Sequence, residues 1–249
     1  MIGRHGPAVL AHLALLAIWL WATTAGGVPR FIVPGPVETF ATLVAPHYGW
    51  AHHVAVTAGQ AAAGFALAVL IGMALAVVFT WFAALRRALM PLLVTLNLVP
   101  KVALAPLFIV WFGYGLLPNI LITFIIAFFP IVITVARGLA EVEPELLDLV
   151  RVQRATRWQV FRKIQLPSAL PYLFSGMRVA AVLAIAGTIV GEFIGSEAGL
   201  GFLMLSAQAT LDTPAMFMAL ILITLIGVGL YVSVVALEAL TVTADARLR

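Results

Sequence analysis

Six long apolar segments dominate this sequence, and each approaches or exceeds the roughly 20 apolar residues that a helix needs to cross a bilayer. The expected spans cover approximately residues 8–24, 54–81, 89–112, 116–136, 172–194 and 215–240. Only 10% of the 249 residues are charged, which is too few for the surface of a soluble protein. The sequence therefore predicts an all-α integral membrane protein with six transmembrane helices in a single domain, residues 1–249. A cytosolic enzyme, a nucleic-acid-binding domain and a disordered chain are excluded.

Basic residues are divided very unevenly between the two sides of these spans. If the N-terminus is cytoplasmic, eleven of the 14 lysines and arginines fall on the cytoplasmic side. They are Arg4, Arg86, Arg87, Arg137, Arg151, Arg154, Arg157, Arg162, Lys163, Arg247 and Arg249. Arg30 falls on the outer side, and Lys101 and Arg178 fall within spans. This positive-inside bias predicts a multi-pass protein with both termini in the cytoplasm.

The first apolar segment has a second interpretation, because a basic start followed by an apolar stretch is also typical of a signal peptide. Trp19 and Trp21 stand at its far end, where tryptophan is common in membrane-spanning helices, and no small-x-small cleavage site follows at once. We therefore expect an uncleaved span.

One loop, residues 137–171, is much longer than the others and contains six of the eleven cytoplasmic basic residues. Glu143, Pro144 and Glu145 form a typical helix start, with proline in the first turn and acids near the positive end of the helix dipole. The next ten residues mix apolar and charged side chains. A short cytoplasmic helix is therefore expected here.

A second short helix is expected to begin at Thr156, because Thr156 and Gln159 have the spacing of a capping box. Pro167 and Pro171 are expected to end this helix and to return the chain to the membrane.

Trp158 and Phe161 are apolar side chains in a loop outside the bilayer. A solvated loop explains the charge of residues 137–171 but not these side chains, and ordered apolar groups outside a membrane normally dock onto something. They indicate a cytoplasmic protein partner.

The same loop, EPELLDLVRVQRATRWQVFRKIQLPSALPYL, resembles the EAA loop of bacterial binding-protein-dependent ABC importer permeases. That signature is an EAA triplet, a glycine six residues after its glutamate, and I-x-L-P. The matching positions are Asp148, Leu149 and Val150 for the triplet, Arg154 for the glycine, and Ile164, Leu166 and Pro167 for the end. Residues 31–43, 98–113 and 190–204 are similar to the nitrate, sulfonate and taurine branch of these permeases, and the resemblance covers roughly residues 28–240.

The resemblance implies a type I-like importer permease in a bacterial inner membrane, with residues 137–171 as the loop that couples it to the ATPase. It implies two ABC ATPase subunits, an extracytoplasmic solute-binding protein and a second permease copy, expected to be identical, in the surrounding lipid. The coupling residues are then expected to be Asp148, Arg151, Arg154, Ala155, Thr156, Arg157, Trp158 and Phe161. If the glycine of the signature supplies a positive φ, Arg154 is expected to turn differently or to lengthen the first helix.

The chain is not expected to be an enzyme, because it contains no phosphate-binding G-x-x-x-x-G-K-[ST] motif, so ATP hydrolysis would belong to a separate subunit. It has no cysteine, and its five histidines lack the spacing of a metal site. No metal, cofactor or nucleic-acid partner is expected.

Two charged residues within spans are the candidates for the translocation pathway or a gate. Lys101 stands between Pro100 and Pro106, in a span that these prolines are expected to break. A lysine in a broken helix is expected to face a cavity, with Asn97 on the same face. Glu192, near the outer end of the fifth span, is expected to gate the outer mouth, to pair with Lys101 or to reach water.

The solute implied by the resemblance is an anion such as nitrate, a sulfonate or taurine, or a pyrimidine-type vitamin precursor. The charge of Lys101 favours an anion. An ion-coupled secondary transporter is the alternative function, but it predicts an internal repeat and gives no role to the long basic loop. A membrane scaffold is a third possibility, and it would need neither Lys101 nor the glycine-rich outer segment.

Overall fold

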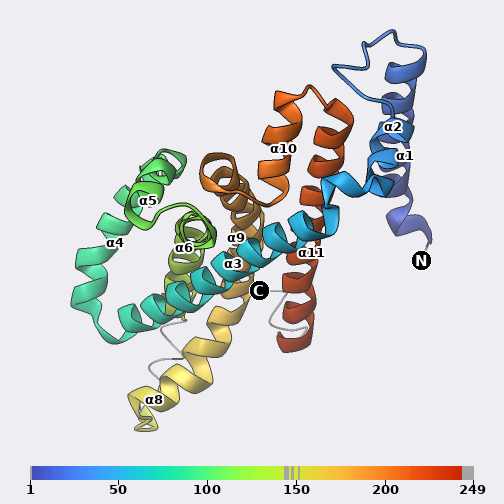
Figure 1. Cartoon of the computed structure of the whole chain (residues 1–249). Helices are drawn as coiled ribbons and strands as arrows, with labels where there is room; N and C mark the ends of the chain where they lie inside the picture. Colours follow the sequence, from blue (N-terminus) through green and yellow to red (C-terminus); the bar gives the residue numbers. More distant parts are fainter. Residues whose placement is uncertain (1, 143–145, 147–148, 151, 243–249) are drawn as a thin grey trace. The chain divides into compact units, whose positions relative to one another are not determined.

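The computed structural model describes residues 2–142, 146, 149–150 and 152–242, and every regular element in these ranges is a helix (Figure 1). The longer helices are α1 (Ile2–Thr24), α3 (Trp50–Trp81), α4 (Ala83–Leu98), α6 (Leu116–Ala140), α9 (Leu166–Gly195) and α11 (Thr213–Thr241). The shorter ones are α2 (Pro36–Ala41), α5 (Ala105–Phe112), α8 (Arg157–Val160) and α10 (Leu200–Ala209). The predicted all-α class is confirmed.

Four helical segments are long and apolar enough to cross a membrane: Pro46–Trp81, Leu116–Ala140, Arg157–Gly195 and Thr213–Thr241. They correspond to four of the six expected spans. The pair α4 and α5 gives a fifth if it counts as one span, and the apolar stretch of α1, Val9–Thr24, is shorter. The structure thus supports four or five spans, and the sixth remains a prediction.

The third expected span is broken, as the prolines predicted. The helices Ala83–Leu98 and Lys101–Phe112 are bent by 87°. Val99 is extended, with φ −63° and ψ 130°, because the ring of Pro100 disfavours the helical conformation in the residue before it. Lys101 begins a 3₁₀ turn, Lys101–Leu104, that leads into α5. Pro106 is tolerated in the first turn of α5.

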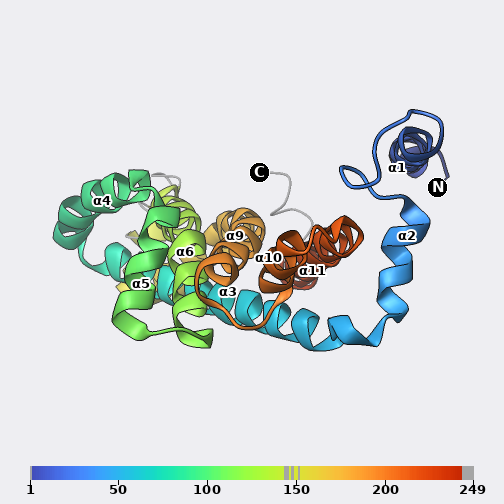
Figure 2. The same cartoon turned by 45° about the horizontal axis from the view of Figure 1, so that its top comes forward.

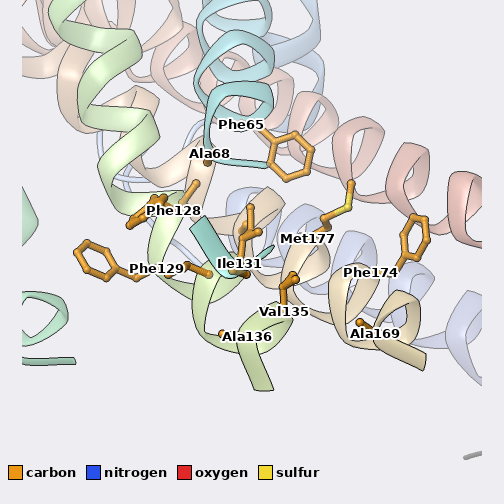
Figure 3. Close-up of a cluster of buried hydrophobic side chains, with 14 of the residues drawn as sticks. Phe65, Ala68, Phe128, Phe129, Ile131, Val135, Ala136, Ala169, Phe174 and Met177 are labelled. Carbon is orange, nitrogen blue, oxygen red and sulfur yellow. The ribbon is translucent and has the colours of Figure 1, made fainter. Parts of the chain in front are cut away.

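The chain divides into two compact units, of which the larger comprises residues 57–197 and 225–249. In this unit α6 lies beside α9 in both views (Figures 1 and 2). Between them lies a buried cluster that includes Phe65 and Ala68 of α3, Ile131 and Val135 of α6, and Met177 of α9 (Figure 3).

Two glycines of α9 let its backbone approach α6 closely. A Cβ atom on Gly191 would lie 2.9 Å from Asn119 Oδ1, and one on Gly187 would lie 3.0 Å from the Cα of Thr123. Small residues at such crossings are typical of membrane helices, where close packing rather than hydrophobicity drives association. The position of α9 therefore depends on these glycines.

The smaller unit comprises residues 1–56 and 198–224. Trp19 donates from Nε1 to the Pro34 carbonyl at 2.9 Å and stacks on Phe217 at 6.2 Å between ring centroids. Helix α10 follows Gly199, whose N–H donates to His53 Nδ1 at 2.9 Å. No helix was predicted in this glycine-rich outer segment, so α10 is an element that the sequence pattern did not indicate.

We expect Gly191→Ala to lower the thermal unfolding temperature of the detergent-purified protein by several degrees. The added methyl would press on Asn119, and overpacking a tight site costs about 1–3 kcal/mol. Gly229→Ala is the matched control, because nothing lies within 4 Å of a Cβ there. If both variants unfold at the wild-type temperature, the close contact between α6 and α9 is wrong.

Candidate functional site

Helix α8 begins where the capping-box spacing predicted. Thr156 Oγ1 accepts from the Gln159 N–H at 3.3 Å, and Gln159 Oε1 accepts from the Thr156 N–H at 2.8 Å. These two bonds satisfy donors that a helix N-terminus otherwise leaves unpaired. The prediction that a helix begins at Thr156 is confirmed.

Arg154 adopts the left-handed conformation itself, with φ +53°. The Ala155 N–H donates to the Val150 carbonyl at 3.0 Å, the backbone bond that ends a helix in a Schellman motif. Glycine is the usual residue at this position, so its place in the EAA signature has a conformational reason. The expectation that Arg154 turns differently is therefore wrong.

Pro167 and Pro171 do not end the second loop helix, which corrects a further expectation. Helix α8 continues through a π-helical stretch, Phe161–Gln165, directly into α9. Pro167 occupies the first turn of α9, where proline is tolerated, and the Leu166 N–H donates to the Phe161 carbonyl. The wider π turn accommodates the ring, and one unbroken helical segment runs from Arg157 to Gly195.

Three aromatic side chains connect this segment to the end of α3. Trp158 stacks on Phe161 at 5.7 Å between ring centroids, and Trp81 lies 6.2 Å from Trp158 and 5.8 Å from Phe161. Phe161 is buried, whereas the side chain of Trp158 is 56% exposed. Most of one large apolar ring is therefore left uncovered.

A cavity of about 460 Å³ adjoins the aromatic cluster, and three of the predicted coupling residues line it together: Ala155, Arg157 and Phe161. Thr156 caps the helix beside them. Asp148, Arg151 and the expected helix start at residues 143–145 lie outside the described residues.

Lys101 lies at the break between α4 and α5, where its ammonium group is hydrogen-bonded to Asn97, four residues earlier. Its Nζ donates to the Asn97 carbonyl at 2.7 Å and to Asn97 Oδ1 at 2.9 Å. The same group lies 4.9 Å from the centroid of the Phe129 ring, at cation–π distance. The structure thus brings together Asn97 and Lys101, as predicted, and adds Phe129.

Glu192 is almost completely buried, with 1% exposure, and its Oε1 accepts from Thr57 Oγ1 at 2.7 Å. It does not pair with Lys101 in the described part of the chain. The interaction joins α9 to α3. Of the expectations for Glu192, exposure to water is excluded by this burial.

Several further polar side chains of α3, α6 and α9 are buried, and none of them was predicted as a candidate site residue. Thr123 and Thr188 share a hydrogen bond at 3.0 Å between their Oγ1 atoms. Gln60 and Asn119 are also buried, and no protein hydrogen bond satisfies their amide groups within the described residues. The sequence signal for these residues is their four-residue spacing, which places Asn119 and Thr123 on one face of α6 and Thr188 and Glu192 on one face of α9.

Arg178, the other basic residue that falls within a span, forms an ion pair with Glu238. The pair connects α9 to α11, and the Glu238 side chain is 10% exposed. The sequence offered no local signal for it, because the partners are 60 residues apart. No group of three metal-ligating side chains was found among the described residues.

Residues 68–242 match the family described as binding-protein-dependent transport system inner membrane component. The chain belongs to this family. It is therefore a membrane-embedded permease of the ABC transporter type, a transport component rather than an enzyme, and the resemblance to the permease family is confirmed.

Three relatives agree with this assignment. The riboflavin transport system permease protein RibX of Chloroflexus aurantiacus is 37% identical over 94% of this chain and 88% of that protein. The formylaminopyrimidine transport permease protein ThiX of Halalkalibacterium halodurans is 30% identical over 92% of each. The putative aliphatic sulfonates transport permease protein SsuC of Bacillus subtilis is 30% identical over 90% of this chain and 83% of that protein.

A solved structure shows the same fold. A chain from an inward-facing crystal form of the MetNI methionine ABC transporter superposes with a TM-score of 0.59. The match covers 74% of this permease and 94% of that chain, at 23% sequence identity. The helical arrangement of an ABC importer permease is therefore present in this chain.

We expect Arg154→Gly to stabilise the loop and Arg154→Ala not to do so. Both variants remove the side chain, but only glycine avoids the cost of a left-handed conformation, about 1–2 kcal/mol. Hydrogen exchange of residues 149–160 is the measurement, and it should slow in the glycine variant relative to the alanine variant. Equal exchange in the two variants would contradict a left-handed conformation at residue 154.

Proposed function

We propose that this permease is the membrane subunit of an ATP-driven importer and forms the pathway for a small solute delivered by an extracytoplasmic binding protein. Two copies of the chain, each a single domain with six spans and both termini in the cytoplasm, would sit in the inner membrane of a bacterium. Two separate ABC ATPase subunits would hydrolyse ATP below them. Family membership and the positive-inside bias of the sequence support this arrangement.

The observation that carries the proposal is the unbroken helical segment Arg157–Gly195, which exposes Trp158 near its start and is long and apolar enough to cross a membrane. Its 39 residues make a rod of about 58 Å at 1.5 Å per residue. A displacement of α8 by an ATPase would therefore be passed directly to α9. Rigid-body movement of this kind is a common basis of alternating access.

The residues around α8 have the chemistry of a docking surface. The exposed ring of Trp158 supplies apolar area, while Arg157 on the same helix can form charge-assisted hydrogen bonds with carboxylates of the ATPase. Arg154 lies at the turn before α8 and is exposed. Asp148 and Arg151 retain their proposed coupling roles from the EAA-loop resemblance.

For the solute pathway we propose Lys101 and Asn97 at the helix break, with Glu192 in an outer gate. The break frees backbone groups that are tolerated in a membrane only where protein or water can satisfy them. Burial of Glu192 against Thr57 makes it a residue that holds α3 and α9 together, so its effect on the gate would act through helix position.

Two solute classes are proposed, and the relatives name examples of each. RibX and ThiX are named for riboflavin and formylaminopyrimidine, and SsuC for aliphatic sulfonates. The solute is then either a vitamin-type heterocycle or a small organic or inorganic anion. Calorimetry with the partner binding protein and one compound of each class separates them, because a heterocycle-specific protein would give no heat with taurine or nitrate.

We expect Trp158→Ala to leave the permease in the membrane but to release its ATPase. Truncating an aromatic anchor in a buried interface often costs about 2 kcal/mol or more, whereas a solvated side chain contributes little. The measurement is co-purification of the ATPase in mild detergent, followed by solute uptake in proteoliposomes.

Trp111→Ala is the matched control for that experiment. Trp111 is 63% exposed, similar to Trp158, but it lies on α5 at the far end of the broken pair. It should retain both the ATPase and uptake. A Trp158→Ala transporter with a full complement of ATPase and full uptake would show that the loop serves only as a topology signal.

We expect Lys101→Met to assemble with a normal amount of ATPase but to lose most solute uptake. Methionine keeps the length of the side chain and its contact with Phe129 while removing the charge. Uptake in proteoliposomes is measured beside the unfolding temperature.

Lys163→Met controls for the loss of one positive charge, because Lys163 is exposed in the π-helical stretch outside the proposed pathway. Uptake by the Lys101→Met transporter equal to that of this control would remove Lys101 from the pathway.

A further inference from the structure

A small hollow lies between the first turns of α4 and the last turns of α6, and none of the individually named coupling or pathway residues lines it. Its volume is about 350 Å³. The lining residues are Arg86, Met90, Ala136, Arg137, Ala140 and Glu141. Two arginines from different helices thus line the hollow together with the apolar side chains of one methionine and two alanines.

Glu141 is the acidic group of the hollow, and it already has partners. Arg137 Nε donates to Glu141 Oε2 at 3.2 Å. Hydrogen bonds from Tyr172 and Arg137 lower the pKa of Glu141 below its usual value, so its charge stays engaged with these two residues. The Arg137 guanidinium keeps further N–H donors, because a guanidinium carries five.

Arg86 is the second cation. It is exposed, and no ion pair to it is found within the described ranges. It lies in the first turns of α4, near the positive end of the helix dipole. The balance of charge at the hollow therefore favours an anion.

The residues that precede and follow the lining residues in the sequence indicate where the hollow lies relative to the membrane surface. Trp81 ends α3 and Phe82 separates it from α4, and aromatic residues of this kind concentrate at the boundary between hydrocarbon and headgroups. Arg86 and Arg87 follow within two turns, on the side that carries the excess of basic residues. Met90 and Ala136 continue into the apolar part of the helices.

We propose that this hollow binds the phosphate of an anionic phospholipid of the cytoplasmic leaflet, with Arg86 and Arg137 as the two ligands. Guanidinium groups bind phosphate oxygens with paired, charge-assisted hydrogen bonds. Basic pockets between transmembrane helices on the cytoplasmic side are typical binding places for acidic lipid headgroups. A soluble phosphate would leave Met90 and Ala136 unused, whereas the glycerol and first methylene groups of a lipid would cover them.

Such a lipid would bridge α4 and α6 at the cytoplasmic end of the broken helix pair. Binding of this lipid does not depend on a particular ATPase or solute. A negative result for the lipid would therefore leave the proposed import function intact.

The experiment compares the full-length wild-type chain with the Arg86→Gln/Arg137→Gln double variant. Each is extracted in mild detergent, and retained lipid is identified by native mass spectrometry. Each is then placed in nanodiscs of phosphatidylcholine alone or with 20% phosphatidylglycerol, and its unfolding temperature is measured. Inorganic phosphate at 10 mM, added to the phosphatidylcholine discs, tests a soluble ligand. The control is Arg162→Gln/Lys163→Gln, which removes two cytoplasmic charges outside the hollow.

We expect at least a fivefold loss of retained phosphatidylglycerol in the Arg86/Arg137 variant, loss of its stabilisation by phosphatidylglycerol, and wild-type behaviour of the control. Ala140→Phe, which fills the hollow and keeps both arginines, should lose the lipid in the same way if the double variant proves unstable. Equal retention in wild type, Arg86/Arg137 and Ala140→Phe proteins would overturn the proposal. Stabilisation by inorganic phosphate equal to that by the lipid, or retention of an acidic protein in place of lipid, would also overturn it.

Discussion

The close packing of α9 on α6 is the constraint on which the rest of the larger unit depends. In a bilayer the lipid tails are as apolar as the helix surfaces, so helices associate through tight contacts and interhelical hydrogen bonds. Both occur here: Gly187 and Gly191 let the backbones approach, and Thr123 and Thr188 share a hydrogen bond across the contact. Because α8 and α9 form one unbroken helical segment, the same contact also fixes the direction in which α8 projects.

Proline shows how far local sequence can predict such a structure. Pro100 and Pro167 both follow helical stretches, and both were expected to interrupt a helix. Only Pro100 does so, since Val99 adopts the extended conformation that precedes proline. At Pro167 the π-helical stretch provides a wider turn, and the helix continues. The local pattern, a proline after a helical stretch, is the same at both positions and does not distinguish the two outcomes.

Features of the candidate site that depend on neighbouring residues could be predicted from the sequence, and those that depend on distant residues could not. The cap of α8 could be predicted because Thr156 and Gln159 are three residues apart and their interaction is contained within one turn. The partners of Glu192 and Arg178 could not, since Thr57 and Glu238 are 135 and 60 residues away. A single sequence marks both charges as costly in a membrane but gives no information on which helix supplies the compensating group.

These distant contacts join α3 and the α8–α9 segment at both ends. Near one end, Thr57 donates to Glu192; at the other, Trp81 contacts Trp158 and Phe161. Two helices connected at two well-separated points resist rotation against each other more than helices joined at one point. A force applied to Trp158 would therefore move α3 together with α9. The buried carboxylate of Glu192 would then hold α3 and α9 together at the end most distant from Trp158. A hydrogen bond to a carboxylate suits this role because it is strong in a low-dielectric interior.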